Sequence, residues 1–179
     1  MNTYYNKSKN NRRKSVKALT PLWLLVCMVA VAACSSIDCP MDNLVYTQYQ
    51  LLKPDGSADE MADSLTITTH RNDGNDSVLI NRDIKIKDFI LPISYAQPTD
   101  SFFFHMQDTV TKQIYIDTVT VSKKDMIHFE STDCATSYFH TLTDVKCTTH
   151  RIDSVKIINH DVNYDTSKKH FSIYFHPHN

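Results

Sequence analysis

The sequence predicts an all-β protein, an antiparallel β-sandwich of the immunoglobulin-like kind with about eight to ten strands. From Leu44 onward, apolar and polar residues alternate with a period of two, as in a strand with one buried face. Clusters of Asp, Asn, Ser, Gly and Pro interrupt this alternation at regular intervals and indicate turns. No window has the 3.6-residue apolar stripe of an amphipathic helix, and 18 of the 20 acidic residues are Asp, a poor helix former.

The expected strands follow one another closely. The first covers 44–52 and ends at the turn sequence Pro-Asp-Gly of 54–56; the second covers 65–69 and precedes the turn cluster 72–76. The apolar run 102–106 is short enough to be a strand buried on both faces. The other expected strands are 78–80, 84–86, 89–95, 114–116, 119–121, 127–129, 138–142, 155–158 and 171–175. Their uneven lengths favour a sandwich over a closed barrel, and a short helical turn is expected only within 161–169.

The N-terminal segment has the features of a secretory signal. Residues 1–17 contain six Lys and Arg, no acidic residue precedes Asp38, and an apolar run follows over 21–33. This run is shorter than the roughly 20 residues that a membrane-spanning helix needs. Residues 31–34, Val-Ala-Ala-Cys, resemble the bacterial lipobox, in which the cysteine receives a diacylglycerol and becomes the new N-terminus. An uncleaved N-terminal anchor is the alternative.

These features divide the chain into a signal peptide over 1–33, a lipidated N-terminus with a short tether over 34–43, and a single domain over 44–179. Acyl chains on Cys34 are then the contact with the membrane, and three chains bind far more firmly than one. Because Ser35 is not acidic, we expect the outer membrane, with the periplasmic face favoured over the cell surface. Removal of the leader leaves 13 Lys and Arg against 20 Asp and Glu, a net charge of −7, which argues against nucleic acid as a partner.

Three cysteines follow the lipobox: Cys39, Cys134 and Cys147. An exported domain meets an oxidising compartment, so we expect at least one disulfide. Cys39 and Cys134 stand in similar settings, Ser-Ile-Asp-Cys and Ser-Thr-Asp-Cys, and this similarity favours their pairing. A Cys134–Cys147 bond across a hairpin is the alternative. The remaining thiol is expected to be a buried small apolar group and not a nucleophile.

A tripeptide of Asp, a hydroxyl residue and an aliphatic residue occurs five times. Asp and Ser or Thr often cap turns by bonding local backbone amides before a strand begins, which explains the repeat without any modification. The same tripeptide resembles the acceptor sequence for O-glycosylation in some Gram-negative envelopes. The candidate hydroxyls are Ser64, Ser77, Thr109, Thr118 and Ser154.

The sequence predicts no catalytic residue, no metal site and no cofactor. The nine histidines, with 176–178 (His-Pro-His) the closest pair, lack the spacing of zinc ligands. Residues 73–76 resemble only a fragment of a calcium-binding loop, because its spaced carboxylates and terminal Glu are missing. With only two glycines, Gly56 and Gly74, the chain lacks a Gly-x-Ser-x-Gly elbow and a phosphate-binding loop.

The lipobox together with 36–40, 49–53, 102–104 and 161–165 resembles one family of small, uncharacterised lipoproteins from anaerobic Gram-negative bacteria, which contain a domain of unknown function. The resemblance implies an envelope location and brings no catalytic residues. We therefore expect a lipid-anchored, non-enzymatic binding or scaffolding module with an envelope protein as partner. The alternatives are an envelope hydrolase with a dispersed Asp/His site and, third, a metal-handling protein.

Overall fold

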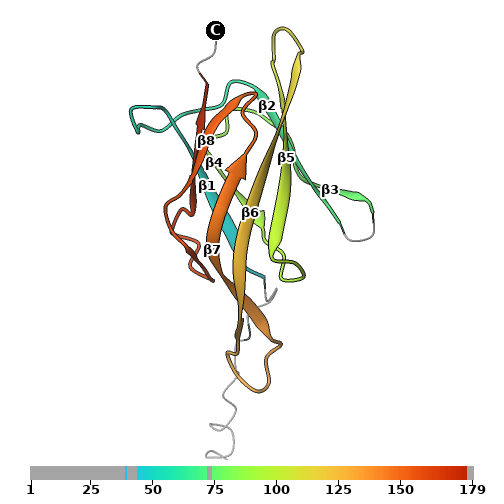
Figure 1. Ribbon diagram of the computed structural model, residues 1–179, viewed down its shortest axis with the longest axis vertical. Coiled ribbons are helices and arrows are strands. Elements are labelled where there is room, and N and C mark those ends of the chain that lie inside the picture. The colour runs from blue at the N-terminus through green and yellow to red at the C-terminus, as the bar shows by residue number, and fades with distance from the viewer. Residues whose placement is uncertain (1–38, 40–43, 72–73, 177–179) are drawn as a thin grey trace, which may run out of the picture. The chain divides into compact units, whose positions relative to one another are not determined.

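The computed structural model describes residues 39, 44–71 and 74–176, which form ten strands and no helix (Figure 1). The strands are β1 (Tyr46–Leu52), β2 (Ser64–His70), β3 (Asp76–Asp83), β4 (Asp88–Pro92), β5 (Thr99–Gln107), β6 (Ile114–His128), β7 (Ser137–Cys147), β8 (Ile152–Ile157), β9 (Asp161–Val162) and β10 (Phe171–Phe175). This part of the chain thus contains no helix that is long and apolar enough to cross a membrane. The all-β prediction is confirmed.

The strands form two sheets, one with the order β4-β1-β10-β8 and one with the order β3-β2-β5-β6-β7-β9. Every pairing is antiparallel except that of β1 with β10, in which Tyr49 lies opposite Phe171 and Leu52 opposite Tyr174. The expectation of an entirely antiparallel fold is corrected by this pair. The strand order also differs from the A-B-E-D and C-F-G order of immunoglobulin constant domains.

Side chains from both sheets form one hydrophobic core. The Tyr49 ring, which is fully buried, stacks between those of Phe89 (4.9 Å between centroids) and Phe171 (4.7 Å) within the first sheet. Phe89 also contacts Phe104 of β5 in the second sheet, edge to face at 6.0 Å. Aromatic contacts of this geometry add stability beyond the area that they bury. The two sheets therefore share a core, and its aromatic centre joins them.

The alternation along β5 corrects one expectation. Phe102, Phe104 and Met106 are buried, whereas Phe103 and His105 between them are only partly covered. The run 102–106 is therefore not buried on both faces. Its outward aromatic side chain packs at the surface, where the Phe103 ring lies 4.6 Å from that of His70.

β6 corrects another expectation, because it is one strand of 15 residues where the sequence predicted three short ones. The buried positions along it include Asp117 and Lys123 as well as Val119 and Val121. In the sequence, the charged residues Asp117 and Lys123 interrupt the apolar alternation, and this is why one strand was predicted as three.

Other expected elements differ as well. Residues 84–86 are not a strand, since Lys85 has a positive φ of 57° that extended backbone does not tolerate. Residues 161–169 contain the short strand β9 in place of a helical turn. The turns at Gly56 (φ 83°) and Gly74 (φ 80°) are present where the sequence predicted turns, in the left-handed conformation that glycine adopts readily.

Candidate functional site

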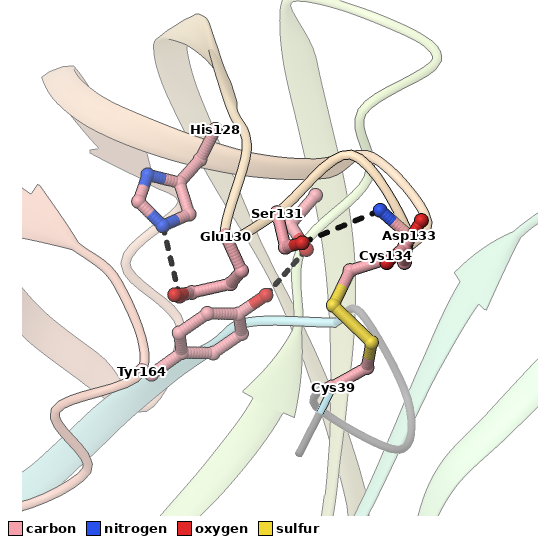
Figure 2. The surroundings of a disulfide bond; sticks show 8 residues. Cys39, His128, Glu130, Ser131, Asp133, Cys134 and Tyr164 are labelled. Atoms are coloured by element: carbon pink, nitrogen blue, oxygen red, sulfur yellow. Dashed lines mark hydrogen bonds and ion pairs between the residues drawn. A yellow bond between two sulfur atoms is a disulfide. The ribbon is translucent and has the colours of Figure 1, made fainter. Parts of the chain in front are cut away.

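One end of the domain is tied to the N-terminal tether. Cys39 and Cys134 form a disulfide with their Cα atoms 5.5 Å apart, and Cys134 lies in the loop between β6 and β7 (Figure 2). Beside it Nε2 of His128 lies 2.9 Å from Oε1 of Glu130, within hydrogen-bond distance, and the Tyr164 hydroxyl donates to that of Ser137. The predicted pairing is confirmed and the alternative with Cys147 is excluded.

The third cysteine has the environment of a packing residue. Cys147 is a free thiol at the end of β7, half-buried and packed against the core. Burial raises the pKa of its thiol, so the reactive thiolate is disfavoured at neutral pH. Cys34, the predicted lipidation site, lies outside the described residues.

A buried charged network holds the base of the β6–β7 hairpin. The side chain of Lys123 has no exposed surface, and its Nζ lies 3.5 Å from both Asp100 and Asp125 and donates to the carbonyl of Gln97. Asp125 Oδ1 is in turn 2.7 Å from Nδ1 of His140, which is 2 % exposed. Buried charges require such pairing, because an isolated one carries a large desolvation cost.

Burial also determines the protonation of this network. Desolvation raises the pKa of Asp100, although Lys123 opposes the shift. Desolvation lowers the pKa of His140, although its hydrogen bond to Asp125 opposes the change. At neutral pH His140 is therefore a neutral imidazole. The network links β5, β6 and β7, which makes it a structural clamp.

The other end of the domain has a cleft of about 530 Å³, around the end of β10 that lies uppermost in Figure 1. Its lining contains apolar side chains and charged residues of both signs, with the acids in excess. The lining residues are Lys53, Pro54, Asp55, Asp59, Glu60, Met61, Ala62, Asp63, Met106, Arg151, Phe175 and His176. They come from the β1–β2 connection, β5, the β7–β8 connection and the end of β10, so sequence reasoning did not bring them together.

Asp63 and Arg151 form the charged centre of the cleft. Nη2 of Arg151 donates to Oδ2 of Asp63 at 2.8 Å, and the side chains are 16 % and 5 % exposed. The guanidinium also lies over the Tyr115 ring, 5.5 Å from its centroid. Within the described residues, Nε of Arg151 is buried without a hydrogen-bond partner. Such a donor is uncommon and is available to water or to an acceptor on a ligand.

Asp117 positions the loop that carries Arg151. One carboxylate oxygen accepts from the hydroxyl of Thr148 (2.7 Å) and the backbone of His150 (2.8 Å); the other accepts from the backbone of Arg151 (2.7 Å) and Ile152 (2.9 Å). Burial raises the pKa of this carboxyl, but these hydrogen bonds outweigh it and the net pKa is below the ordinary Asp value. Asp117 is therefore an ionised anchor that holds the 148–152 turn against β6.

The five candidate hydroxyls are spread over the molecule. Thr109 is exposed in the β5–β6 turn, while Ser64, Ser77, Thr118 and Ser154 lie within strands and are partly buried. The local-capping explanation of the repeat holds at Asp108, whose Oδ1 accepts from the backbone of Val110 (2.7 Å) and Thr111 (2.8 Å). It does not hold at Asp63, whose partner Arg151 is 88 positions away in the sequence. Nor does it hold at Asp117, whose partners, from Thr148 to Ile152, are 31 to 35 positions away.

The described histidines serve different partners. His170 is 1 % exposed; its Nδ1 accepts from the backbone of Gln48 (3.0 Å) and its Nε2 donates to the carbonyl of Asp161 (3.1 Å). Both bonds require the neutral tautomer, and burial lowers the pKa of this ring. Among the residues with described positions, no three His, Cys, Asp or Glu side chains form a metal-binding group. Residues 177 and 178 of the His-Pro-His sequence lie outside them.

Together these features define a two-sheet, disulfide-linked β-domain with a mixed-charge cleft at one end. Residues 64–175, more than half of the chain, match the model of a family described as Family of unknown function (DUF6452), and the protein belongs to this family. The predicted resemblance is confirmed at the level of an uncharacterised family. Neither a curated protein nor a solved structure matches the chain.

Proposed function

We propose that the protein is a lipid-anchored envelope lipoprotein whose β-domain acts as a non-enzymatic binding or scaffolding module. The observation that carries the proposal is the Cys39–Cys134 disulfide. Disulfides persist in oxidising compartments, and this one begins five residues after the lipobox cysteine. It would attach the body of the domain directly to the segment that bears the lipid.

The details of the anchor belong to the same proposal. The leader 1–33 would be removed, Cys34 would carry the acyl chains, and the outer membrane, on its periplasmic face, would be the location. The basic leader, the lipobox and the resemblance to lipoproteins of anaerobic Gram-negative bacteria support this. The common core of the two sheets supports a sandwich as the form of the domain.

Fractionation of cells tests the anchor. The wild-type protein is expected in the outer-membrane fraction and to require detergent for release, whereas Cys34→Ser should be released without detergent or stay in the inner membrane with its leader. A Cys147→Ser variant is the matched control, because it removes a thiol that lies in neither the lipobox nor the disulfide. Wild-type and Cys34→Ser proteins with the same distribution would contradict the anchor.

The cleft around Arg151 is the proposed binding surface. Four of its lining residues are acids, Asp55, Asp59, Glu60 and Asp63, and Glu60 lies 3.2 Å from Lys87. The excess of acids in the lining and the net charge of −7 after the leader favour a basic segment of an envelope protein as the occupant.

Photo-crosslinking in intact cells tests the binding surface. A photoreactive residue at Glu60 should give a discrete adduct with an envelope protein. The control is the same residue at Val78 of β3, which is 57 % exposed and outside the cleft lining. Equal adducts from both positions, or none from position 60, would argue against the cleft.

Modification of the repeated tripeptide is a separate part of the proposal. Thr109 is the most accessible of the five hydroxyls, since it is exposed at the tip of the β5–β6 turn. Mass spectrometry of the native protein should find sugar there first. An unmodified peptide at all five positions would end this idea and leave the anchor untouched.

A further inference from the structure

The tip of the β6–β7 hairpin exposes apolar side chains on consecutive residues. From Asp117 to Lys123, β6 alternates between buried and partly buried positions, but the four residues 124–127 are all exposed. Both faces of the strand are therefore uncovered there. Met126, Ile127 and Phe129 are 52 %, 61 % and 67 % exposed. In Figure 1 the loop of this hairpin points downward, and the strand that leads to the C-terminus, β10, ends at the top.

Most other exposed apolar residues are scattered. Val78, Ile84, Ile90, Val110 and Ile158 lie on different strands or connections, whereas Ile114 and Ile116 lie two positions apart at the start of β6. Single apolar residues of this kind are normal on protein surfaces. Three within four residues at the tip of a hairpin are not explained in that way.

The tip is held in a fixed direction. The register of β6 and β7 shifts between Ser122 and Lys123, and a shift of this kind bends a hairpin. Directly at the shift, the buried Lys123 is clamped between Asp100 and Asp125. Beyond it the rings of His128 and Phe139 stack at 4.1 Å. The apolar residues are therefore presented outward and do not fold back onto the core.

The length of the tether limits how far the tip lies from the acylated residue. Cys39 follows Cys34 by five residues, which span at most about 18 Å when extended. The disulfide places Cys134 beside Cys39 (Figure 2). Phe129 precedes Cys134 by five residues in the same loop. The chain thus keeps this loop close to whatever surface the lipid occupies.

We propose that Met126, Ile127 and Phe129 enter the interface of the bilayer that holds Cys34, so that the domain stands on its β6–β7 hairpin with the cleft facing away from the membrane. The inference rests on the proposed lipid anchor. Amphipathic rings lie behind the tip: Tyr138 of β7 stacks at 4.8 Å on Tyr95 of the β4–β5 loop. Tyrosines are favoured at the level of lipid headgroups.

The charges near the tip permit this contact. Glu130 is paired with His128 at 2.9 Å, and Asp125 is held by Lys123 and His140. Lys124 is exposed and contributes a cation, and Asp133 of the same loop is exposed and contributes an anion. The surface is therefore suited to apolar insertion and not to attraction by anionic lipid, in keeping with the net acidity of the domain.

The processed chain offers a clean spectroscopic test, because the single tryptophan of the sequence, Trp23, lies in the leader. A tryptophan introduced as Phe129→Trp is then the only one. The full-length lipidated variant is reconstituted into vesicles of phosphatidylethanolamine and phosphatidylglycerol, with or without bromine on the acyl chains. The matched control is Val110→Trp in the β5–β6 turn at the other end, where Val110 is 86 % exposed.

We expect the emission of Phe129→Trp to shift to shorter wavelength and to be quenched at least threefold by brominated lipid, whereas Val110→Trp changes little. Equal and weak quenching of both variants overturns the inference. A blue shift of Phe129→Trp without quenching also overturns it, because a protein surface or a second copy then covers the tip. The acyl mass at Cys34, measured on the same samples, separates the two proposals. If it is present without quenching, only the membrane contact fails; if it is absent, the anchor fails and the contact falls with it.

Discussion

Removal of the Cys39–Cys134 disulfide should destabilise the domain more than any other single change in its cysteines. The bond joins residues separated by 95 positions. In the chain-entropy model, closing a loop of this length lowers the entropy of the unfolded chain by about 16 cal/mol/K, equivalent to about 4.7 kcal/mol at 25 °C. The native sheets need not change, because β1 begins at Tyr46, seven residues after Cys39.

The corresponding change in melting temperature follows from the size of the domain. With an unfolding entropy of roughly 2.1 cal/mol/K per residue over the 44–179 segment, a loss of about 4.7 kcal/mol lowers the melting temperature by roughly 16 °C. The assay is urea and thermal unfolding of the double variant Cys39→Ser/Cys134→Ser, followed by circular dichroism. The comparison protein is Cys147→Ser, which keeps the disulfide. A loss below about 1 kcal/mol would refute the claim that the bond restrains the unfolded chain.

Three further predictions concern the buried ionisable groups. Lys123→Met leaves two carboxylates without their shared cation and should lower the free energy of unfolding by roughly 3–5 kcal/mol in urea titrations, with partial recovery when Asp100→Asn is added; no recovery would argue against the pair. The pKa of Asp117 is lowered in the folded protein, so its contribution to stability is complete above the ordinary Asp pKa of about 3.9 and is lost as pH falls through the folded pKa. Asp117→Asn should therefore reduce the dependence of the free energy of unfolding on pH below about pH 4. His170 has a lowered pKa, so the unfolded chain binds the proton more readily and stability should fall as pH drops below about 6.5. His170→Gln should reduce that decline between pH 7.5 and 5.5, and an unchanged slope would contradict the assignment.

Local patterns in the sequence predicted strands well where burial alone governs the residue choice. The alternation in 44–52, 65–69 and 171–175 corresponds to β1, β2 and β10. Prediction failed where polar groups occupy inward positions. Asp117 and Lys123 are buried because partners up to 35 positions away satisfy them, and no local pattern indicates such partners.

Topology and the cleft depend on the same kind of long-range information. The parallel pairing of β1 with β10 joins Tyr49 to Phe171 across most of the domain, and the register of neighbouring short strands does not determine it. In the sequence Asp63 is only the first residue of one of the repeated tripeptides, and its contact with Arg151 spans 88 positions. The disulfide was predictable, since the flanking residues of Cys39 and Cys134 carry a visible similarity.

The exposure of the hairpin tip is not visible in the local sequence. Residues 127–129, Ile-His-Phe, have the alternation of a short strand, as the sequence analysis expected. The exposure of Ile127 and Phe129 appears only in the structure, where both lie at the far end of the 15-residue strand β6 or just beyond it. The apolar hairpin tip lies within a few residues of the disulfide that binds the tether. This arrangement favours a fixed orientation of the domain relative to the proposed membrane.

The central claim is that the domain is held at a membrane through one acylated sulfur. Intact-mass and peptide analysis of the protein isolated from its native envelope tests it most directly. We predict an N-terminal peptide that begins at Cys34 and carries the mass of a diacylglycerol and a further acyl chain. A mature chain that begins at any other residue, or a Cys34 peptide of unmodified mass, would contradict the account.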